Sequence, residues 1–220
     1  AKAAGVGRFI HASTSGTIGI STDPDYIATE NDPAPTELIN KFPYYRTKLY
    51  AEIDALARNE EGFEVLSVNP SLLLGPGDEH GSSTEDVRRA LEQPMPIATA
   101  GGVSFVDARD AAEAMVLAIE KGRPGSRYLL TACNCSVRTF FSRVARVAGT
   151  QGPMLSLPDD DRVRKASKWL VRSARKWLGE DDAFMDEHTV DVGQHYWYVY
   201  ASLAEDELGW RPRDAMATLA

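Results

Sequence analysis

The most constraining feature of the sequence is an alternation of short apolar runs with helical patterns over its first 150 residues. The apolar runs, each short enough for a buried strand, lie at 8–12, 63–68, 103–106 and 127–131. Segments with apolar residues three and four apart, the spacing of a helix face, lie at 43–58, 107–121 and 137–148. Strands that alternate with helices are typical of β/α units. We therefore predict an α/β fold with a mostly parallel sheet flanked by helices.

Polar residues gather where two of these predicted strands end. Ser13, Thr14 and Ser15 directly follow the first apolar run, and Asn69-Pro70 follows the second. Because ligands bind at the carboxyl ends of strands in open α/β sheets, we expect both groups to face a common site.

The helix predicted between these strands begins with a tyrosine and a lysine four residues apart, Tyr44 and Lys48. Residues at this spacing share one helix face. A phenol with a pKa near 10 exchanges protons poorly at neutral pH, and a nearby ammonium lowers that pKa. A hydroxyl from the neighbouring strand end would hold a carbonyl or alcohol oxygen against the phenol. The pattern therefore predicts a proton-transfer site.

Five successive segments resemble landmarks of the extended short-chain dehydrogenases/reductases, and most closely the NAD-dependent epimerase/dehydratase family. They are RFIHASTSGTIG, PYYRTKLYAE, VNPSLLLGPGD, SFVDARDAAEAMVLAIEKGRPGSRYLL and YASLAEDELGWRPR. Within that family the chain is similar to the dihydroflavonol-4-reductase-like and hopanoid-associated sugar-epimerase-like branch. The resemblance implies the C-terminal part of a Rossmann-like parallel sheet with a smaller, mainly helical substrate-binding lobe.

The same resemblance implies roles for individual residues. The catalytic tyrosine, lysine and hydroxyl of the family fall on Tyr44, Lys48 and Thr14, with Ser13 and Ser15 as neighbours that would substitute for Thr14 in a shifted register. The implied cofactor is NAD or NADP. Its nicotinamide would lie against Pro70, Ser71 and Leu72, and Lys48 and Tyr44 would also contact the cofactor.

The glycine-rich turn that binds the cofactor pyrophosphate is not found in the sequence. Gly5 and Gly7 precede a predicted strand rather than a helix and lack a third glycine. We therefore expect the chain to be a piece of a longer protein. We assign 1–150 to the C-terminal part of the NAD(P)-binding domain, with a substrate-loop insertion at about 76–105, and 151–220 to the substrate-binding lobe.

Three functions follow from these observations. The first is an NAD(P)-dependent oxidoreductase that transfers hydride to or from a carbonyl or alcohol, with Tyr44 as proton donor or acceptor. The second is a sugar-nucleotide epimerase or dehydratase, in which the cofactor is recycled within one turnover. The third is a non-catalytic fragment or binding module, which the missing cofactor fingerprint motivates.

Composition restricts the partners. The formal net charge of -8 disfavours nucleic-acid binding, which depends on neutralising phosphates. No apolar run approaches the roughly 20 residues that span a bilayer, so we expect no membrane partner. The partner is then a small-molecule substrate, and the family adds a homodimer. Cys133 and Cys135, the two cysteines, are too close in sequence for a structural staple, which favours a reducing cytoplasm. Their spacing to the histidines predicts no metal site.

Two further segments have more than one interpretation. A basic helix with a tryptophan stripe is predicted over 162–178, and we favour a solvated helix packed on the protein over a membrane-surface helix. The aromatic cluster at 195–198 is equally compatible with a substrate pocket and with core packing.

Overall fold

The structure is a computed structural model that describes residues 1–78, 81, 84–92, 97–160, 162–163, 166 and 187–219. Its strands are β1 (Arg8–Ala12), β2 (Glu64–Pro70), β3 (Leu72–Leu74), β4 (Ile97–Ala98), β5 (Gly102–Asp107), β6 (Arg127–Leu130), β7 (Cys133–Ser136) and β8 (Leu155–Ser156). Its helices and helical turns are η1 (Lys2–Ala4), η2 (Ser15–Thr17), α1 (Thr36–Ile39), α2 (Pro43–Leu56), α3 (Glu85–Glu92), α4 (Ala108–Lys121), α5 (Val137–Ala148), α7 (Glu187–Val192), η3 (Ala204–Leu208) and α8 (Ala215–Leu219).

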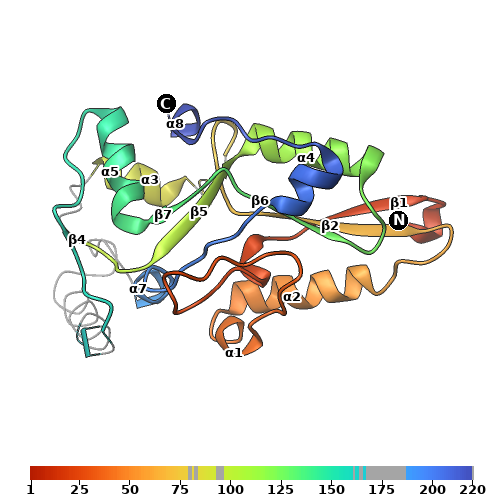
Figure 1. Cartoon of the computed structure of the whole chain (residues 1–220), viewed down its shortest axis with the longest axis horizontal. Coiled ribbons are helices and arrows are strands. Elements are labelled where there is room, and N and C mark those ends of the chain that lie inside the picture. Colours follow the sequence, from red (N-terminus) through yellow and green to blue (C-terminus); the bar gives the residue numbers. More distant parts are fainter. Residues whose placement is uncertain are drawn as a thin grey trace.

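Three parallel strands in the order β1-β2-β6 form the first sheet. Helix α2 covers one face of this sheet and α4 covers the other (Figure 1). With helices on both faces, the central strand is buried from Val65 to Asn69, which explains its near-continuous apolar run. This layered α/β arrangement confirms the predicted fold class.

The sequence predicts one mostly parallel sheet, and the structure divides the described strands among three, the smallest of which is the parallel pair β4-β8. After Pro70 the chain bends at Ser71, and β3 then pairs with β5 in a second sheet of order β3-β5-β7. Strand β7 runs antiparallel to β5. The second sheet lies beside the end of the first (Figure 1). The carboxyl end of β2 therefore lies at the junction between the two sheets.

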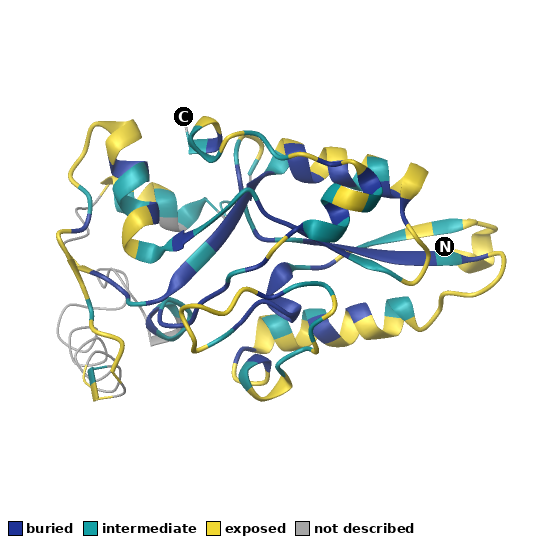
Figure 2. Cartoon of the chain, in the orientation of Figure 1, coloured by how far each residue is buried: buried dark blue, intermediate teal, exposed yellow. Residues whose placement is uncertain are grey.

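The main core lies between the first sheet and α4, and the C-terminal segment closes it. Trp210 is fully buried there, packed in one cluster with Leu66 and Tyr128, and its indole nitrogen donates to the Asp110 carbonyl oxygen at 2.9 Å. Figure 2 shows the buried residues concentrated on the strands and on the inner faces of α2 and α4. Residues 201–210 therefore stabilise the same core as the first sheet.

The predicted helices over 43–58, 107–121 and 137–148 are confirmed as α2, α4 and α5. Asp107 caps α4, as a residue of its type at that position should, because its side chain accepts from the Arg109 backbone nitrogen. Of the basic helix predicted over 162–178, only residues 162–163 and 166 are described, so the rest lies outside the described residues. Among the helices that are described, none has the length and apolar character needed to cross a membrane.

Candidate active site

Helix α2 places its first residues beside the end of β1. Pro43 occupies the first turn, where its missing N–H costs no helical hydrogen bond. Tyr44 follows it, with a side chain that is 56% exposed and a ring packed edge-on against Tyr45 at 5.0 Å between centroids. The phenol is thus held by one aromatic neighbour and left open to a ligand.

The strand end after β1 turns sharply towards α2. Ser15–Thr17 form the helical turn η2, and the Thr14 hydroxyl accepts from the Gly16 backbone nitrogen at 3.4 Å. A Cβ atom at Gly16 would lie 2.3 Å from the Tyr45 ring. Only glycine allows the strand end and the tyrosine pair to approach this closely.

A cavity of about 560 Å³ opens at this junction. Its wall includes five of the six residues that the sequence predicts for catalysis and cofactor contact, namely Thr14, Tyr44, Pro70, Ser71 and Leu72. These residues come from three chain segments, so the fold brings the separate sequence signals together.

Lys48 is the predicted residue that does not line the cavity. Its Nζ donates to the carbonyl oxygen of Ala12, the last residue of β1, at 3.0 Å. The ammonium therefore lies at the same strand end as Thr14, one helical turn away from Tyr44.

The pKa of the Tyr44 phenol differs in direction from the sequence-based expectation. Burial raises this pKa above its ordinary value. The predicted lowering by Lys48 is wrong for this arrangement, because the lysine ammonium is directed at a backbone carbonyl instead. In this state Tyr44 is a protonated hydrogen-bond donor at neutral pH.

The hydroxyls of the strand end have different surroundings. Ser13 is buried, and its hydroxyl donates to the carboxylate of Glu52. The Thr14 hydroxyl accepts from Gly16, which leaves its proton available to the cavity. Ser15 is also on the cavity wall. All three residues line the cavity, and the hydroxyl of Ser13 is committed to the buried carboxylate of Glu52.

Glu52 is a site residue that the sequence reasoning missed. It is 1% exposed, and its Oε2 accepts from Ser13, from the Thr17 hydroxyl at 3.0 Å and from Asn69 Nδ2 at 2.7 Å. Its other oxygen lies 3.4 Å from Arg127 Nη1. This carboxylate joins α2, the end of β1, β2 and β6. The available signal was spacing, since Glu52 follows Lys48 by four residues and shares its helix face.

The remaining cavity wall was not predicted, apart from one aromatic residue. It is mostly apolar, with Leu73, Val87, Val103, Val137, Phe140, Phe141, Val192 and Trp197. Trp197, from the aromatic cluster at 195–198, packs against Tyr45 at 4.5 Å between centroids. That residue therefore fulfils both interpretations of the cluster, core packing and pocket lining.

One cationic side chain, Arg89, belongs to the described wall of this cavity, and it is paired with Glu85 at 2.8 Å. A search of the described residues for three or more histidine, cysteine or acidic side chains around a metal site found none. The geometry therefore offers a hydroxyl, a phenol and an apolar chamber, with the ammonium of Lys48 behind them.

Comparison with known proteins gives this arrangement a family. A sequence profile of the NAD-dependent epimerase/dehydratase family matches residues 1–130. The chain belongs to that family. Its members are NAD-dependent enzymes, which confirms at the family level both the predicted resemblance and NAD or NADP as the cofactor.

Two curated relatives are similar in sequence. The chain is 31% identical over 164 residues to a Synechocystis sp. protein named "Putative dihydroflavonol 4-reductase", covering 72% of the chain and 47% of the relative. It is 31% identical over 160 residues to sterol demethylase protein B of Methylococcus capsulatus, covering 72% and 48%. The chain thus spans about half the length of these relatives.

Solved structures share the fold. A nucleoside-diphosphate-sugar epimerase from Pseudomonas aeruginosa matches with a TM-score of 0.72 at 20% identity, over 96% of this chain and 63% of that one. RMD from the same organism, complexed with NADPH, matches with a TM-score of 0.64 at 18% identity, over 99% and 66%. At these identities the likeness extends to the Rossmann-like architecture alone.

Proposed function

We propose that this chain carries the proton-transfer half of the active site of an NAD(P)-dependent oxidoreductase acting on a carbonyl or alcohol. The observation that carries the proposal is the shared cavity of about 560 Å³, because Thr14, Tyr44 and the segment Pro70–Leu72 all line it. Tyr44 and Thr14 are the catalytic residues, and Lys48 is the third member of the set.

The wall formed by Pro70, Ser71 and Leu72 fits the nicotinamide part of a cofactor. The Ser71 hydroxyl is buried on this wall and has no hydrogen-bond partner in the part of the chain that the structure describes. Such an orphaned hydroxyl suits an amide-bearing ring flanked by apolar side chains. When bound, the cofactor supplies or accepts hydride at the substrate carbon.

The residues of the chain would handle the substrate oxygen. In the reducing direction the Tyr44 phenol donates its proton to the carbonyl oxygen, and its raised pKa keeps that proton in place at neutral pH. The Thr14 hydroxyl holds the same oxygen by a hydrogen bond. The Lys48 ammonium would leave its hydrogen bond to the Ala12 carbonyl oxygen to stabilise the phenolate that forms, and water then returns the proton.

The character of the cavity supports a reductase over a sugar-nucleotide epimerase or dehydratase. A sugar nucleotide carries a diphosphate, which requires cationic partners. Arg89 is the cation on the described wall, and Glu85 already neutralises it. Phe140, Phe141 and Trp197 instead offer a large apolar surface. The names of the two curated relatives agree with an apolar carbonyl or alcohol as substrate.

Three further expectations are proposals, and they concern the division into domains, the oligomeric state and the cellular compartment. Residues 1–150 would form the nucleotide-binding part and 151–220 the substrate lobe. A homodimer is proposed from the family alone. The two free cysteines support a reducing compartment such as the cytoplasm.

The test uses the protein as its gene encodes it. NADPH and NADH are titrated by fluorescence, and cofactor consumption is then followed with an apolar cyclic ketone. Steady consumption of cofactor supports the proposal. Product isomerised without net cofactor change would support the epimerase or dehydratase instead. Absence of NAD(P) binding would overturn both enzyme functions and leave a non-catalytic module.

A further inference from the structure

A second reactive group lies outside the active-site cavity, on strand β7. Cys133 and Cys135 are two apart on this strand, so both side chains point to the same face of the sheet. Both are free thiols, and Cys133 is the more exposed of the two. The pair is thus one accessible thiol with a buried thiol beside it.

Helix α5 brings an arginine to the accessible thiol. Arg143 Nη1 lies 3.2 Å from the Cys133 sulfur and donates a hydrogen bond to it. The neighbouring Cys135 thiol is the largest cause that lowers the pKa of the Cys133 thiol. Burial opposes this lowering, and the hydrogen bond and charge of Arg143 lower the pKa further. The contact with Cys133, together with burial, raises the pKa of Cys135, and the charge of Arg143 opposes this rise. Asp214 opposes the lowering at longer range.

One contact favours the protonated form. The Cys133 thiol donates weakly to the Asn134 carbonyl oxygen at 3.6 Å. This bond to sulfur is longer and weaker than the charge-assisted bond from Arg143. Deprotonation therefore exchanges a weak hydrogen bond for a stronger one.

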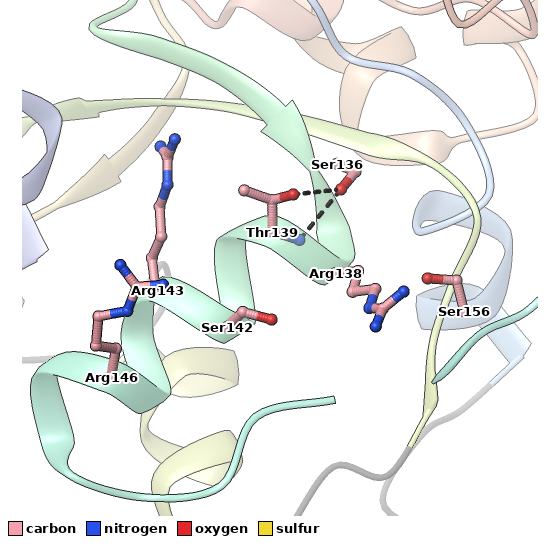
Figure 3. Close-up of a pocket in the computed structure, with 7 residues that line it drawn as sticks. All are labelled: Ser136, Arg138, Thr139, Ser142, Arg143, Arg146 and Ser156. Carbon is pink, nitrogen blue, oxygen red and sulfur yellow. Dashed lines mark hydrogen bonds between the residues drawn. The ribbon is translucent and has the colours of Figure 1, made fainter. Parts of the chain in front are cut away.

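The face of α5 that carries Arg143 is strongly cationic. A cavity of about 650 Å³ is lined by Ser136, Arg138, Thr139, Ser142, Arg143, Arg146 and Ser156 (Figure 3). Figure 3 shows Arg138 directed towards Ser156, whereas Arg143 and Arg146 lie together at the other end of the cavity. Within the described residues, no carboxylate forms an ion pair with Arg138, Arg143 or Arg146. A cavity of this kind attracts carboxylates.

We propose that Cys133 is the nucleophile of a thiol–disulfide exchange site that accepts low-molecular-weight disulfides bearing carboxylates. The Cys133 thiolate attacks one sulfur of the disulfide. A new S–S bond forms at Cys133, the original S–S bond breaks, and the other half leaves as a thiolate. Two electrons remain within the sulfur atoms, so no further oxidant is required. Arg143 activates the thiolate, and Arg146 attracts the carboxylates.

The modified residue would lie one strand from the active-site cavity. Strand β7 pairs with β5, with Cys133 opposite Phe105. The same strand β5 contributes Gly102, Val103 and Ser104 to the wall of the active-site cavity. The exchange site is independent of the proposed oxidoreductase chemistry, because Tyr44, Thr14 and Lys48 are not among the described residues that line the cationic cavity.

The experiment compares two reagents on the full chain. One is 5,5′-dithiobis(2-nitrobenzoate), which carries carboxylates, and the other is the neutral 4,4′-dithiodipyridine. Release of the leaving thiolate gives the rate, and peptide mass mapping locates the adduct. Cys133→Ser sets the background. At pH 7 we expect Cys133 to react first and at least 5-fold faster with the anionic reagent, relative to the ratio of the two rates for free cysteine.

Variants distinguish the activation of the Cys133 thiolate by Arg143 from the attraction of carboxylates by Arg146. Arg143→Gln should slow both reagents at least 5-fold, because the thiolate loses its charged partner. Arg146→Gln should slow the anionic reagent alone, at least 3-fold. Arg58→Gln, an exposed arginine outside this cavity, is the matched control and should leave both rates within 2-fold.

The pH dependence of the reaction rate of wild-type Cys133 tests the proposal without any substitution that could alter the fold. An ordinary thiol with a pKa near 8.5 reacts about 20-fold more slowly at pH 7 than at pH 9. For Cys133 we expect less than a 5-fold difference. A full 20-fold dependence, or a Cys133 that reacts only after unfolding in urea, would overturn the proposal. Equal acceleration of both reagents would overturn its carboxylate preference.

Discussion

Asn69 Nδ2 lies 2.7 Å from Glu52 Oε2, and this hydrogen bond ties the end of strand β2 to the middle of helix α2. The same carboxylate oxygen accepts from Ser13 at the end of β1. The two strand ends and the helix that form the active-site cavity are thus connected through one buried carboxylate. A buried charge with these partners fixes a geometry that apolar packing alone leaves adjustable.

Replacement of Glu52 by glutamine should therefore destabilise the chain. The amide keeps one acceptor but loses the charge that attracts Arg127, and it directs N–H groups at existing donors. We expect the free energy of unfolding to fall by about 2–3 kcal/mol. Urea denaturation followed by circular dichroism measures this. Asp54→Asn is the control on the same helix, because Asp54 pairs with Arg58 on the exposed surface and should contribute less than about 0.5 kcal/mol. Equal losses in the two variants would contradict the interpretation.

The sequence was sufficient for some parts of the fold. Helices α4 and α5 were predictable because their amphipathic spacing specifies them, and α2 because Pro43 suits a first helical turn. Strand β7 was not predictable, since its sequence CNCS has only four residues and contains no β-branched or aromatic side chain. It is a strand because it pairs with β5, and that contact is distant in sequence.

Some residues of the candidate active site were likewise predictable from the sequence, and others were not. Tyr44, Lys48 and Thr14 stood at recognisable spacings or strand ends. Spacing places Glu52 on the helix face of Lys48, but its burial depends on the packing of α2 against β2 and does not follow from that spacing. The apolar wall of the cavity is assembled from α5, β5 and the segment around Trp197, and no local pattern brings those together.

The phenol of Tyr44 should matter for turnover and little for stability. Tyr44→Phe keeps the ring that packs against Tyr45 and removes only the hydroxyl. We expect kcat to fall by about 100-fold or more and the free energy of unfolding to change by less than about 0.5 kcal/mol. The measurement is NADPH oxidation with the gene-encoded protein. Tyr50→Phe, on the same helix and 60% exposed, should leave both quantities unchanged. Retained activity in Tyr44→Phe would assign proton transfer to another group.

Substitution of the two neighbouring hydroxyl residues at the end of β1 should affect different quantities, namely kcat for Thr14 and the free energy of unfolding for Ser13. Thr14→Ala is expected to lower kcat by about 10-fold or more, since it removes the hydrogen bond to the substrate oxygen, and Thr14→Ser should restore most of it. Ser13→Ala should instead lower the free energy of unfolding by about 1 kcal/mol, because Glu52 loses a buried donor. Kinetics and urea denaturation of the three variants make the comparison. The reverse assignment, with Ser13→Ala the more deleterious for kcat, would place the catalytic hydroxyl one residue earlier.

Gly16→Ala should disturb the tyrosine pair. The new methyl group would meet the Tyr45 ring at 2.3 Å, so the ring must move away from the strand end. Because Tyr45 packs on Trp197, the shift would pass into the cavity wall. We expect a loss of about 1–3 kcal/mol in the free energy of unfolding. Gly7→Ala is the matched control, because a Cβ there meets no atom within 4 Å. A neutral Gly16→Ala would show that the loop accommodates the methyl group without cost.

Acid stability should depend on Asp107. A side-chain hydrogen bond from Arg109 is the main cause that lowers the pKa of this carboxyl to about 2, against 3.8 for the unfolded chain. A group whose pKa is lower in the folded state stabilises the fold above the unfolded value and loses that contribution as pH falls through the folded value. The free energy of unfolding should therefore decline between pH 4 and pH 2. Removing the arginine partner tests this directly. In Arg109→Gln the decline should be smaller and should be complete at a higher pH, because the folded pKa returns towards the unfolded value of 3.8, and in Asp107→Asn this share of the decline should vanish. Urea denaturation at half-unit pH steps resolves the three curves, and a wild-type curve that coincides with that of Asp107→Asn would show that Asp107 does not contribute.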